Sequence, residues 1–341
     1  ARRALAFAPR LDKRARSGQG AAIMPRLPFL SDPMIAVLVI ATLLALLLPA
    51  SGETRALVSL ISNGGIFVLF LVNGMRLPRG EIARALANAR YFGPLLAFVF
   101  GAMALAGLGL AAIGGALLPP LVALGFVYLG CLPSTVQSAT SYTSLAGGNV
   151  ALAVVGAALI NIVGVFVSAP LFALLGGSGA GTIGSEAIMR IGLILVLPFV
   201  LGQIVQPLVI GQLAQHRARI AWLDRGVIGL AVYVAFSGAV EQGLAQMFAP
   251  RDWVVLVGLV LALLALALTA AWSLGGLIGL ARPDRIAFVF AASQKSVAVG
   301  APLAAILFPA ASAGFIIAPL LLYHLAQLVI AVPLAARLAR G

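Results

Sequence analysis

Apolar stretches of about 20 residues recur along the whole chain and are separated by short polar segments. A helix needs about 20 mostly apolar residues to cross a bilayer, where backbone polar groups must be bonded internally. The strict alternation that is typical of strands is missing from the pattern. The sequence therefore predicts an all-α membrane protein with ten transmembrane helices, over residues 33–50, 58–75, 92–115, 119–144, 150–176, 187–210, 224–246, 252–279, 285–308 and 312–336.

Composition agrees with this prediction and narrows the function classes. The chain is 62% hydrophobic and 9% charged, whereas an ordinary soluble domain is about a quarter charged. A net charge of +13 would suggest nucleic acid in a soluble protein, but here the basic residues fall in loops. One cysteine, Cys131, excludes an internal disulfide, and the two histidines, His216 and His324, lie too far apart to suggest a metal site. We expect no cofactor, no nucleic-acid partner and no enzyme.

The basic residues orient the ten predicted spans. With the N-terminus inside, the inner segments carry seven basic residues before the first span, four after the second, three after the sixth and two each after the eighth and tenth. The outer loops carry only Arg55 and Arg251. Arg190 and Lys295 fall within spans. Basic residues concentrate on the cytoplasmic side of membrane proteins, so we expect an inner-membrane protein with both termini in the cytoplasm and its inner loops against anionic lipid.

The span count divides evenly. Two groups of five spans enter the membrane in opposite senses, which is the geometry of an inverted repeat and common in secondary transporters; an accidental even division is the alternative. Residues 1–23 are either a basic tail or translated sequence upstream of a start at Met24. The predicted organisation is a basic and disordered tail at 1–29, a first repeat at 30–176, a linker at 177–186 and a second repeat at 187–341.

Two spans interrupt their apolar pattern at matching places, the fourth position of each half. The first reads CLPSTVQSATSYTSLAGGN and the second FAASQKSVAVGAP. Proline lacks an N–H and clashes with the preceding turn, so we expect Pro133 to break the first span, and Gly300 with Pro302 to break the second. Paired broken helices indicate a transport site. The candidate residues of this crossing site are Lys295, Gln294, Ser296, Gln137, Ser138, Ser134, Thr135 and Asn161.

Several of these polar residues have a purely structural alternative. Serine and threonine can bond a carbonyl one turn back and pass as small residues at helix contacts, which we favour for Ser141, Thr143 and Ser144. For Gln137 and Ser138 we favour the site. Asn161 fits either a bond between helices or the site, and Asn149 fits a helix N-cap.

Lys295 is the most informative residue. It lies about ten residues from either end of its span, so its amine is about 15 Å from each interface, too far for the side chain to reach water. Ionisable residues in the middle of a span are rare and usually functional. No acidic residue lies mid-span to pair with it. We therefore expect the carbonyl oxygens freed by Pro133, together with Gln137, to hold the ammonium.

These motifs resemble a known family. LPSTVQSATSYTSLAGGNVALAVV and ASQKSVAVGAP are similar to the bile acid:sodium symporter superfamily, and most of all to its bacterial SBF-like branch. The stretches DPMIAVLVIATLLALLLPASG and NGMRLPRGEIARALANARYF add to a resemblance that spans about 30–338. It implies a panel of helices 1, 2, 6 and 7, and a core of helices 3–5 and 8–10 in which helices 4 and 9 are broken and cross. Substrate would bind near the crossing.

The resemblance also implies sodium ligands that this chain lacks. In sodium-coupled members a glutamate and a glutamine of helix 9 act with hydroxyl and amide groups of helices 4 and 5. The glutamine falls on Gln294, but the glutamate falls near Phe290 and the helix 5 hydroxyls on Ala153 and Ala157. The helix 4 pair falls near residues 138–140. We therefore expect Lys295 to supply the positive charge that sodium supplies elsewhere, with a proton or no coupling ion.

The function that we predict is secondary transport of a small organic solute, most readily an anion. A non-transporting membrane regulator or scaffold that keeps the fold and uses Lys295 as a lock is the alternative. A channel would need a continuous polar stripe on several helices, whereas the polar clusters lie on two.

Overall fold

The computed structural model describes residues 32–76, 88–176, 189–243 and 249–340, and these ranges are helical with no strand. Eight helical segments are long and apolar enough to cross a membrane, and the bent pair α6 and α7 makes a ninth candidate. A shorter apolar helix, α1, precedes them. The expected all-α, multi-pass membrane architecture is confirmed. The predicted basic tail and linker lie outside the described residues.

The elements follow the predicted spans closely. Their bounds are α1 Pro33–Leu47, α2 Gly52–Arg76, α4 Ala89–Ala97, the π-helical turn η1 Phe98–Ala102, α5 Met103–Gly114, α6 Pro120–Cys131, α7 Val136–Leu145, α8 Val150–Leu175, the π-helical turn η3 Gly192–Val196, α10 Leu197–Gln215, α11 Arg217–Glu241, α13 Pro250–Leu277, α14 Arg282–Ser293, α15 Val297–Leu307 and α16 Ala310–Leu338. Asn149 caps α8, since its Oδ1 accepts the Leu152 N–H at 3.2 Å, as the sequence predicted.

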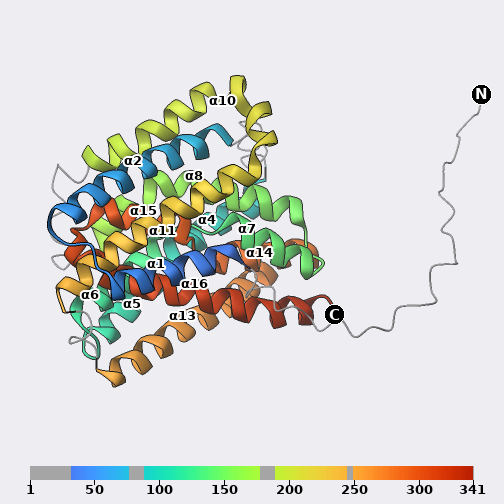
Figure 1. The fold of residues 1–341 in the computed structure, drawn as a ribbon. Helices are drawn as coiled ribbons and strands as arrows, with labels where there is room; N and C mark the ends of the chain where they lie inside the picture. Colours follow the sequence, from blue (N-terminus) through green and yellow to red (C-terminus); the bar gives the residue numbers. More distant parts are fainter. Residues whose placement is uncertain (1–31, 77–87, 177–188, 244–248, 341) are drawn as a thin grey trace, which may run out of the picture.

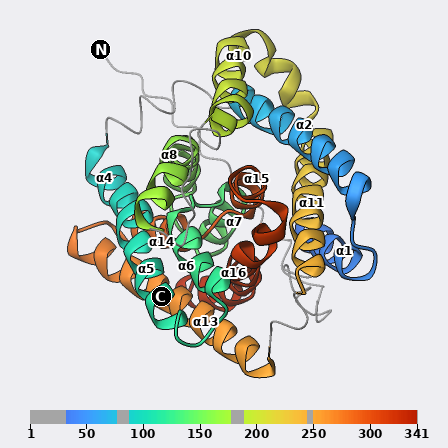
Figure 2. The same ribbon diagram turned by 90° about the vertical axis from the view of Figure 1, so that its left-hand side faces the viewer.

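Four helices form a layer along one edge of the molecule, which we call the peripheral layer: α1, α2, α10 and α11 (Figures 1 and 2). Helix α2 packs on α10 and α11, and α11 packs on α1. Glycines permit the closest of these contacts. A Cβ at Gly74 would lie 2.2 Å from the Phe199 carbonyl oxygen, and one at Gly202 would lie 2.2 Å from that of Leu71. Small residues allow two membrane helices to approach backbone to backbone.

The remaining helices form a second group, the central bundle, which comprises α4–α8 and α13–α16 with η1. Helix α6 packs between α5 and α16, and α14 packs against α13, α7 and α8. Helices α7 and α15 lie on the side of the bundle that faces the peripheral layer (Figure 2). Helix α11 joins the two groups through contacts with α15 and α16. The two interrupted helices therefore lie at the boundary between the two groups.

Candidate functional site

Two interrupted helical segments meet at their breaks in the central bundle, where the Ser296 N–H bonds the Pro133 carbonyl. Helix α6 ends at Cys131 and α7 begins at Val136, with a bend of 65° between them, so the predicted break at Pro133 is confirmed. Helix α14 ends at Ser293 and α15 begins at Val297. The prediction that Gly300 and Pro302 cause the second break is wrong, because both lie inside α15.

The second break is made by partners from elsewhere in the fold. The Lys295 N–H donates to Gln327 Oε1 at 2.8 Å, and Gln327 Nε2 donates to the Lys295 carbonyl at 3.0 Å. The Ser296 N–H donates to the Pro133 carbonyl at 3.0 Å, and Ser296 Oγ caps α15 by accepting the Val299 N–H at 3.3 Å. Backbone groups released from a helix inside a membrane need such partners. Gln327 and Pro133 therefore stabilise the extended segment.

Gly300 allows α15 to pack closely on its neighbours. A Cβ at this position would lie 2.5 Å from Leu320 Cδ2 and 2.6 Å from Leu132 Cδ1. Its carbonyl oxygen accepts a hydrogen bond from the buried Tyr128 hydroxyl. The absence of a side chain lets α15 lie against α16 and against the break after α6.

The Lys295 side chain is fully buried. Its Nζ donates to the carbonyl oxygens of Leu132 at 2.7 Å, Gly130 at 2.9 Å and Val99 at 3.4 Å. An ammonium has three donors and no acceptor, so these three carbonyls match a protonated lysine. The expectation that carbonyls next to Pro133 hold Lys295 is confirmed. The expectation that Gln137 helps is wrong, because Gln137 is exposed and lines a cavity.

Helix ends create the negative potential around this ammonium. Gly130 and Leu132 lie at the carboxyl end of α6, where carbonyls lack helical N–H partners and the dipole is negative. Val99 belongs to the π-helical turn η1, and such turns frequently occur at functional sites. Within the described chain, no ion pair to a carboxylate neutralises Lys295. The positive charge is held by main-chain dipoles alone.

A cavity of about 740 Å³ lies between the peripheral layer and the central bundle. Residues of α1, α2, α10 and α11 line one side, and residues of α7, α8, α15 and α16 line the other. Charged residues line its outer part, where Arg76 donates from Nη1 and from Nη2 to Asp224 Oδ2, both at 2.8 Å. Its deep end reaches the two helix breaks, at Thr135 and Ser296.

The sequence-predicted residues divide between the cavity wall and the layer behind it. Five of them line the cavity: Thr135, Gln137, Ser138, Asn161 and Ser296. The other three, Lys295, Gln294 and Ser134, are buried and do not line it.

Hydrogen bonds connect the two sets. Ser138 Oγ donates to Gln294 Oε1 at 2.6 Å and lies 3.1 Å from Thr135 Oγ1. Asn161 Nδ2 donates to the carbonyls of Ser134 at 2.7 Å and Ala157 at 2.8 Å. Asn161 thus fulfils the interhelical bonding role and also faces the cavity.

The sequence alone does not identify Gln327 as part of the site, and it raises His324 only as a possible metal ligand. Both lie in α16 and are buried, and Gln327 Nε2 lies 2.8 Å from His324 Nδ1. His324 lines the cavity, and its Nε2 has no hydrogen-bond partner among the described residues. Neither residue stands out in the sequence, because a lone polar residue in an apolar span is equally compatible with a helix contact.

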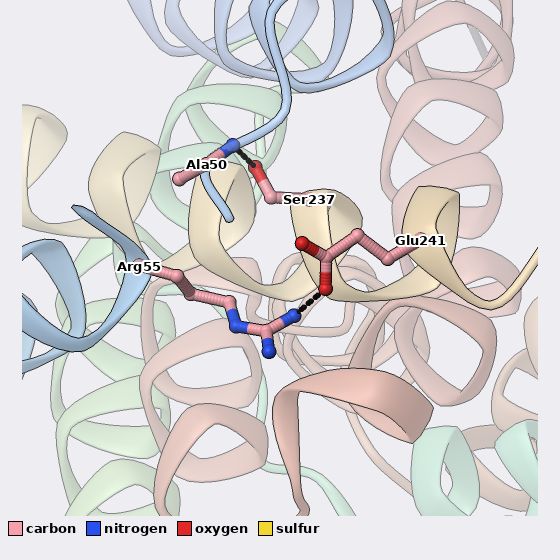
Figure 3. A network of polar contacts seen from close by, with 4 residues as sticks. All are labelled: Ala50, Arg55, Ser237 and Glu241. Atoms are coloured by element: carbon pink, nitrogen blue, oxygen red, sulfur yellow. Dashed lines mark hydrogen bonds and ion pairs between the residues drawn. The ribbon is translucent and has the colours of Figure 1, made fainter. Parts of the chain in front are cut away.

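At the opposite ends of α2 and α11, two contacts hold the peripheral layer together and a third joins it to the central bundle. Arg55 near the start of α2 forms an ion pair with Glu241 at the end of α11, and the Ala50 N–H donates to Ser237 Oγ at 3.2 Å (Figure 3). A Cβ at Gly238 would lie 2.1 Å from the Ala310 carbonyl oxygen. The peripheral layer therefore packs closely on the central bundle where α11 meets α16, beside a smaller cavity of about 170 Å³, while the larger cavity separates the two groups at the Arg76 end.

Three of the positions that the resemblance assigns to sodium ligands, Phe290, Ala153 and Ala157, carry no side-chain oxygen. Phe290 is fully buried and its ring packs on Tyr142 with centroids 5.9 Å apart. Ala153 and Ala157 are fully buried as well. The part of the chain that the structure describes contains no cluster of three His, Cys, Asp or Glu residues able to hold a metal ion.

Comparison with known proteins gives consistent matches over the chain. The model of the SBF-like CPA transporter family matches residues 32–340. An uncharacterized protein of Pseudomonas aeruginosa is 37% identical over 93% of this chain and 96% of its own length. The Escherichia coli protein named "Putative symporter YfeH" is 34% identical over 91% of this chain and 93% of its own. Sodium/bile acid cotransporter 7 of Rattus norvegicus is 26% identical over 60% of this chain and 61% of its own.

Proposed function

Because the chain belongs to the SBF-like CPA transporter family, we propose that it carries a small organic anion across a cell's inner membrane by alternating access. Its relatives carry the names of a symporter and of a sodium/bile acid cotransporter, so an amphipathic organic acid is the substrate class to test first. The described helices make it a multi-pass membrane protein.

The observation that carries this proposal is the one-sided cavity. Its volume of about 740 Å³ falls within the range of about 300–1,000 Å³ for small-molecule sites. It ends at two broken helices, the usual place of a transport site. Toward the opposite end, α11 packs backbone to backbone on α16 at Gly238 and at Gly314, where an added Cβ would lie 2.6 Å from the Ala235 carbonyl oxygen. One open and one closed end correspond to a single state of an alternating-access cycle, in which the central bundle moves against the peripheral layer.

An anionic solute is favoured by the charge behind the cavity wall. Lys295 places a positive charge among main-chain dipoles with no paired carboxylate in the described chain, and Ser296 beside it lines the cavity. The charged side chains that line the cavity, Asp32, Arg76, Asp224 and Arg225, balance one another. The lysine therefore sets the sign of the potential at the deep end, and an anion gains from it.

We extend the proposal to the coupling ion. Phe290, Ala153 and Ala157 offer no oxygen ligands, whereas sodium requires them. Lys295 would then be a covalently attached substitute for sodium, and coupling would use a proton or no ion. The crossing site would comprise the eight predicted residues, five on the cavity wall and three, Lys295, Gln294 and Ser134, buried behind it.

The membrane arrangement completes the proposal. Counting α1 and the α6–α7 pair with the other segments gives ten spans, which we interpret as two inverted repeats of five. The basic residues orient them with both termini in the cytoplasm. The cavity mouth at Arg76 would then face the cytoplasm and the Arg55–Glu241 pair the outside.

One observation favours the alternative of a non-transporting regulator. All three ammonium protons of Lys295 have carbonyl partners, as a permanent lock between η1, α6 and the α14–α15 break would require. Such a protein would keep the fold and bind solute without moving it, or bind none.

The test is binding and flux with a cavity-blocking variant. Ala158 lines the cavity from α8, and Ala151 lies on the exposed face of the same helix. We expect purified wild-type protein to bind radiolabelled cholate, or another member of a panel of organic carboxylates, and to transport it in proteoliposomes. Ala158→Phe abolishes both activities and Ala151→Phe retains them. Binding without flux supports the regulator, and binding of no anion by the folded wild type refutes the proposal.

A further inference from the structure

Gln327 makes three buried hydrogen bonds that join the α14–α15 break to the cavity wall. It is 1% exposed. Its side-chain amide bonds both main-chain groups of Lys295: Oε1 accepts the Lys295 N–H, and Nε2 donates to the Lys295 carbonyl. The third bond goes to the ring of His324, one turn earlier on α16.

The orientation of the amide follows from the backbone groups that it touches. The atom 2.8 Å from the Lys295 N–H must be the acceptor Oε1, and the atom 3.0 Å from the Lys295 carbonyl must be the donor Nε2. In a flipped amide, Nε2 would face the Lys295 N–H, donor against donor, and Oε1 would face the Lys295 carbonyl, acceptor against acceptor. Asn and Gln orientation is decided by such networks, and here both backbone contacts give the same answer.

The orientation of Gln327 determines where the His324 proton lies. Gln327 Nε2 uses one hydrogen on the Lys295 carbonyl and has the other for His324 Nδ1, which is 2.8 Å away. Nδ1 must therefore accept. A neutral imidazole with an accepting Nδ1 carries its proton on Nε2. That Nε2 is buried, has no partner among the described residues and belongs to a residue that lines the cavity.

We infer that Gln327 is a positioning residue: it ties the Lys295 segment to α16 and fixes His324 in the tautomer that carries its proton on Nε2, a buried nitrogen of a residue that lines the cavity. The inference rests on the proposed function in one respect, since it takes the cavity to be the solute site. A fixed donor selects solutes that place an oxygen acceptor there and disfavours those that place a donor. Any movement of the Lys295 backbone also releases His324 from its fixed tautomer.

The two histidines of the chain allow a direct test that needs no ligand. His216 Nδ1 lies 2.9 Å from the Gln212 carbonyl oxygen, so it must donate, and its proton is on Nδ1. The structure therefore assigns opposite tautomers to the two rings. Solid-state ¹⁵N NMR of histidine-labelled protein in lipid distinguishes protonated from unprotonated ring nitrogens, and His216→Asn identifies the His324 signals.

A substitution shows whether Gln327 is the cause. In Gln327→Glu the carboxylate only accepts, so His324 must donate to it from Nδ1, and the Nδ1 signal moves from the unprotonated to the protonated position. The control is Gln137→Glu, which adds a carboxylate facing the same cavity without contacting Gln327. We expect its His324 signals to be the same as those of the wild type.

Two results overturn the inference: wild-type His324 protonated on Nδ1, or a folded Gln327→Glu protein in which the His324 spectrum is unchanged. If Gln327→Glu does not fold, the wild-type spectrum alone still decides the tautomer. The result is separate from the proposed function. If the chain binds no organic anion but shows the expected tautomers, the positioning role of Gln327 stands and only the proposed solute is refuted.

Discussion

Replacing Lys295 by methionine removes the ammonium while leaving a side chain of similar length in its place. The carbonyls of Gly130 and Leu132 then lose donors at 2.9 and 2.7 Å. Both lie at the carboxyl end of α6, where no helical N–H replaces the lost partner. The surroundings are fully buried, so water does not take over readily.

The size of the effect follows from these two acceptors. A buried acceptor left without a donor costs about 1–3 kcal/mol, so two of them cost about 2–6 kcal/mol. The 3.4 Å contact with Val99 adds little at that length. Methionine avoids the cost of burying a charge, which is several kcal/mol in a protein interior. In the wild type the carbonyls and the negative end of the α6 dipole offset this burial cost, and in the variant they remain in place without a cation. We therefore expect a net destabilisation of about 2 kcal/mol, the lower end of the range for the two acceptors.

The assay is the melting temperature of purified protein in one detergent, with sodium absent. A change of 2 kcal/mol corresponds to a drop of about 4 °C or more, on the scaling of about 2 °C per kcal/mol for large domains. Gln137→Met is the matched control, because Gln137 is a polar residue near the crossing that is exposed and makes no bond to Lys295. A methionine variant that melts at or above the wild type would show that the burial cost of the charge exceeds the value of its hydrogen bonds.

Two further predictions concern packing and topology. Gly300→Ala places a methyl group about 2.5 Å from Leu320 and lowers stability by about 1–3 kcal/mol through overpacking, whereas Gly258→Ala, with no atom within 4 Å, leaves the melting temperature unchanged or raises it; equal effects would refute the packing role. In a Cys131→Ser background, an impermeant maleimide labels Arg251→Cys in intact cells and Arg217→Cys only after lysis, and the reverse pattern contradicts the proposed orientation.

The helical architecture and one of the two breaks could be predicted from the sequence, because both depend on local chemistry. Apolar segment length limits a membrane chain to helices. Pro133 lacks the N–H that a continuing helix would use, and α6 does end before it, although Pro302 carries the same local signal and lies inside α15. Asn149 likewise caps α8 through a contact three residues away. The partners of Lys295 were partly predictable, since a helix that ends at Pro133 must leave free carbonyls nearby.

The second break could not be located from local signals. It depends on Gln327, which is 32 residues beyond Lys295, and on the Pro133 carbonyl from the other half of the chain. Gly300 gives the same sequence signal whether it breaks a helix or permits close packing, and here it does the latter. Gln137 is near Pro133 in sequence, but α7 directs it into the cavity. These features depend on tertiary contacts, which cannot be identified from a single sequence.

Sodium dependence tests most directly whether Lys295 takes the place of a sodium ion. The measurement is the melting temperature of wild type and Lys295→Ala in sodium chloride and in potassium chloride of equal ionic strength. An ion that binds only the folded protein raises its stability. We predict no difference between the two salts for the wild type, and stabilisation by sodium only in Lys295→Ala, where the shortened side chain leaves the carbonyls of Gly130 and Leu132 free for a cation. Specific stabilisation of the wild type by sodium would contradict this account, because it would mean that an ion site exists beside Lys295.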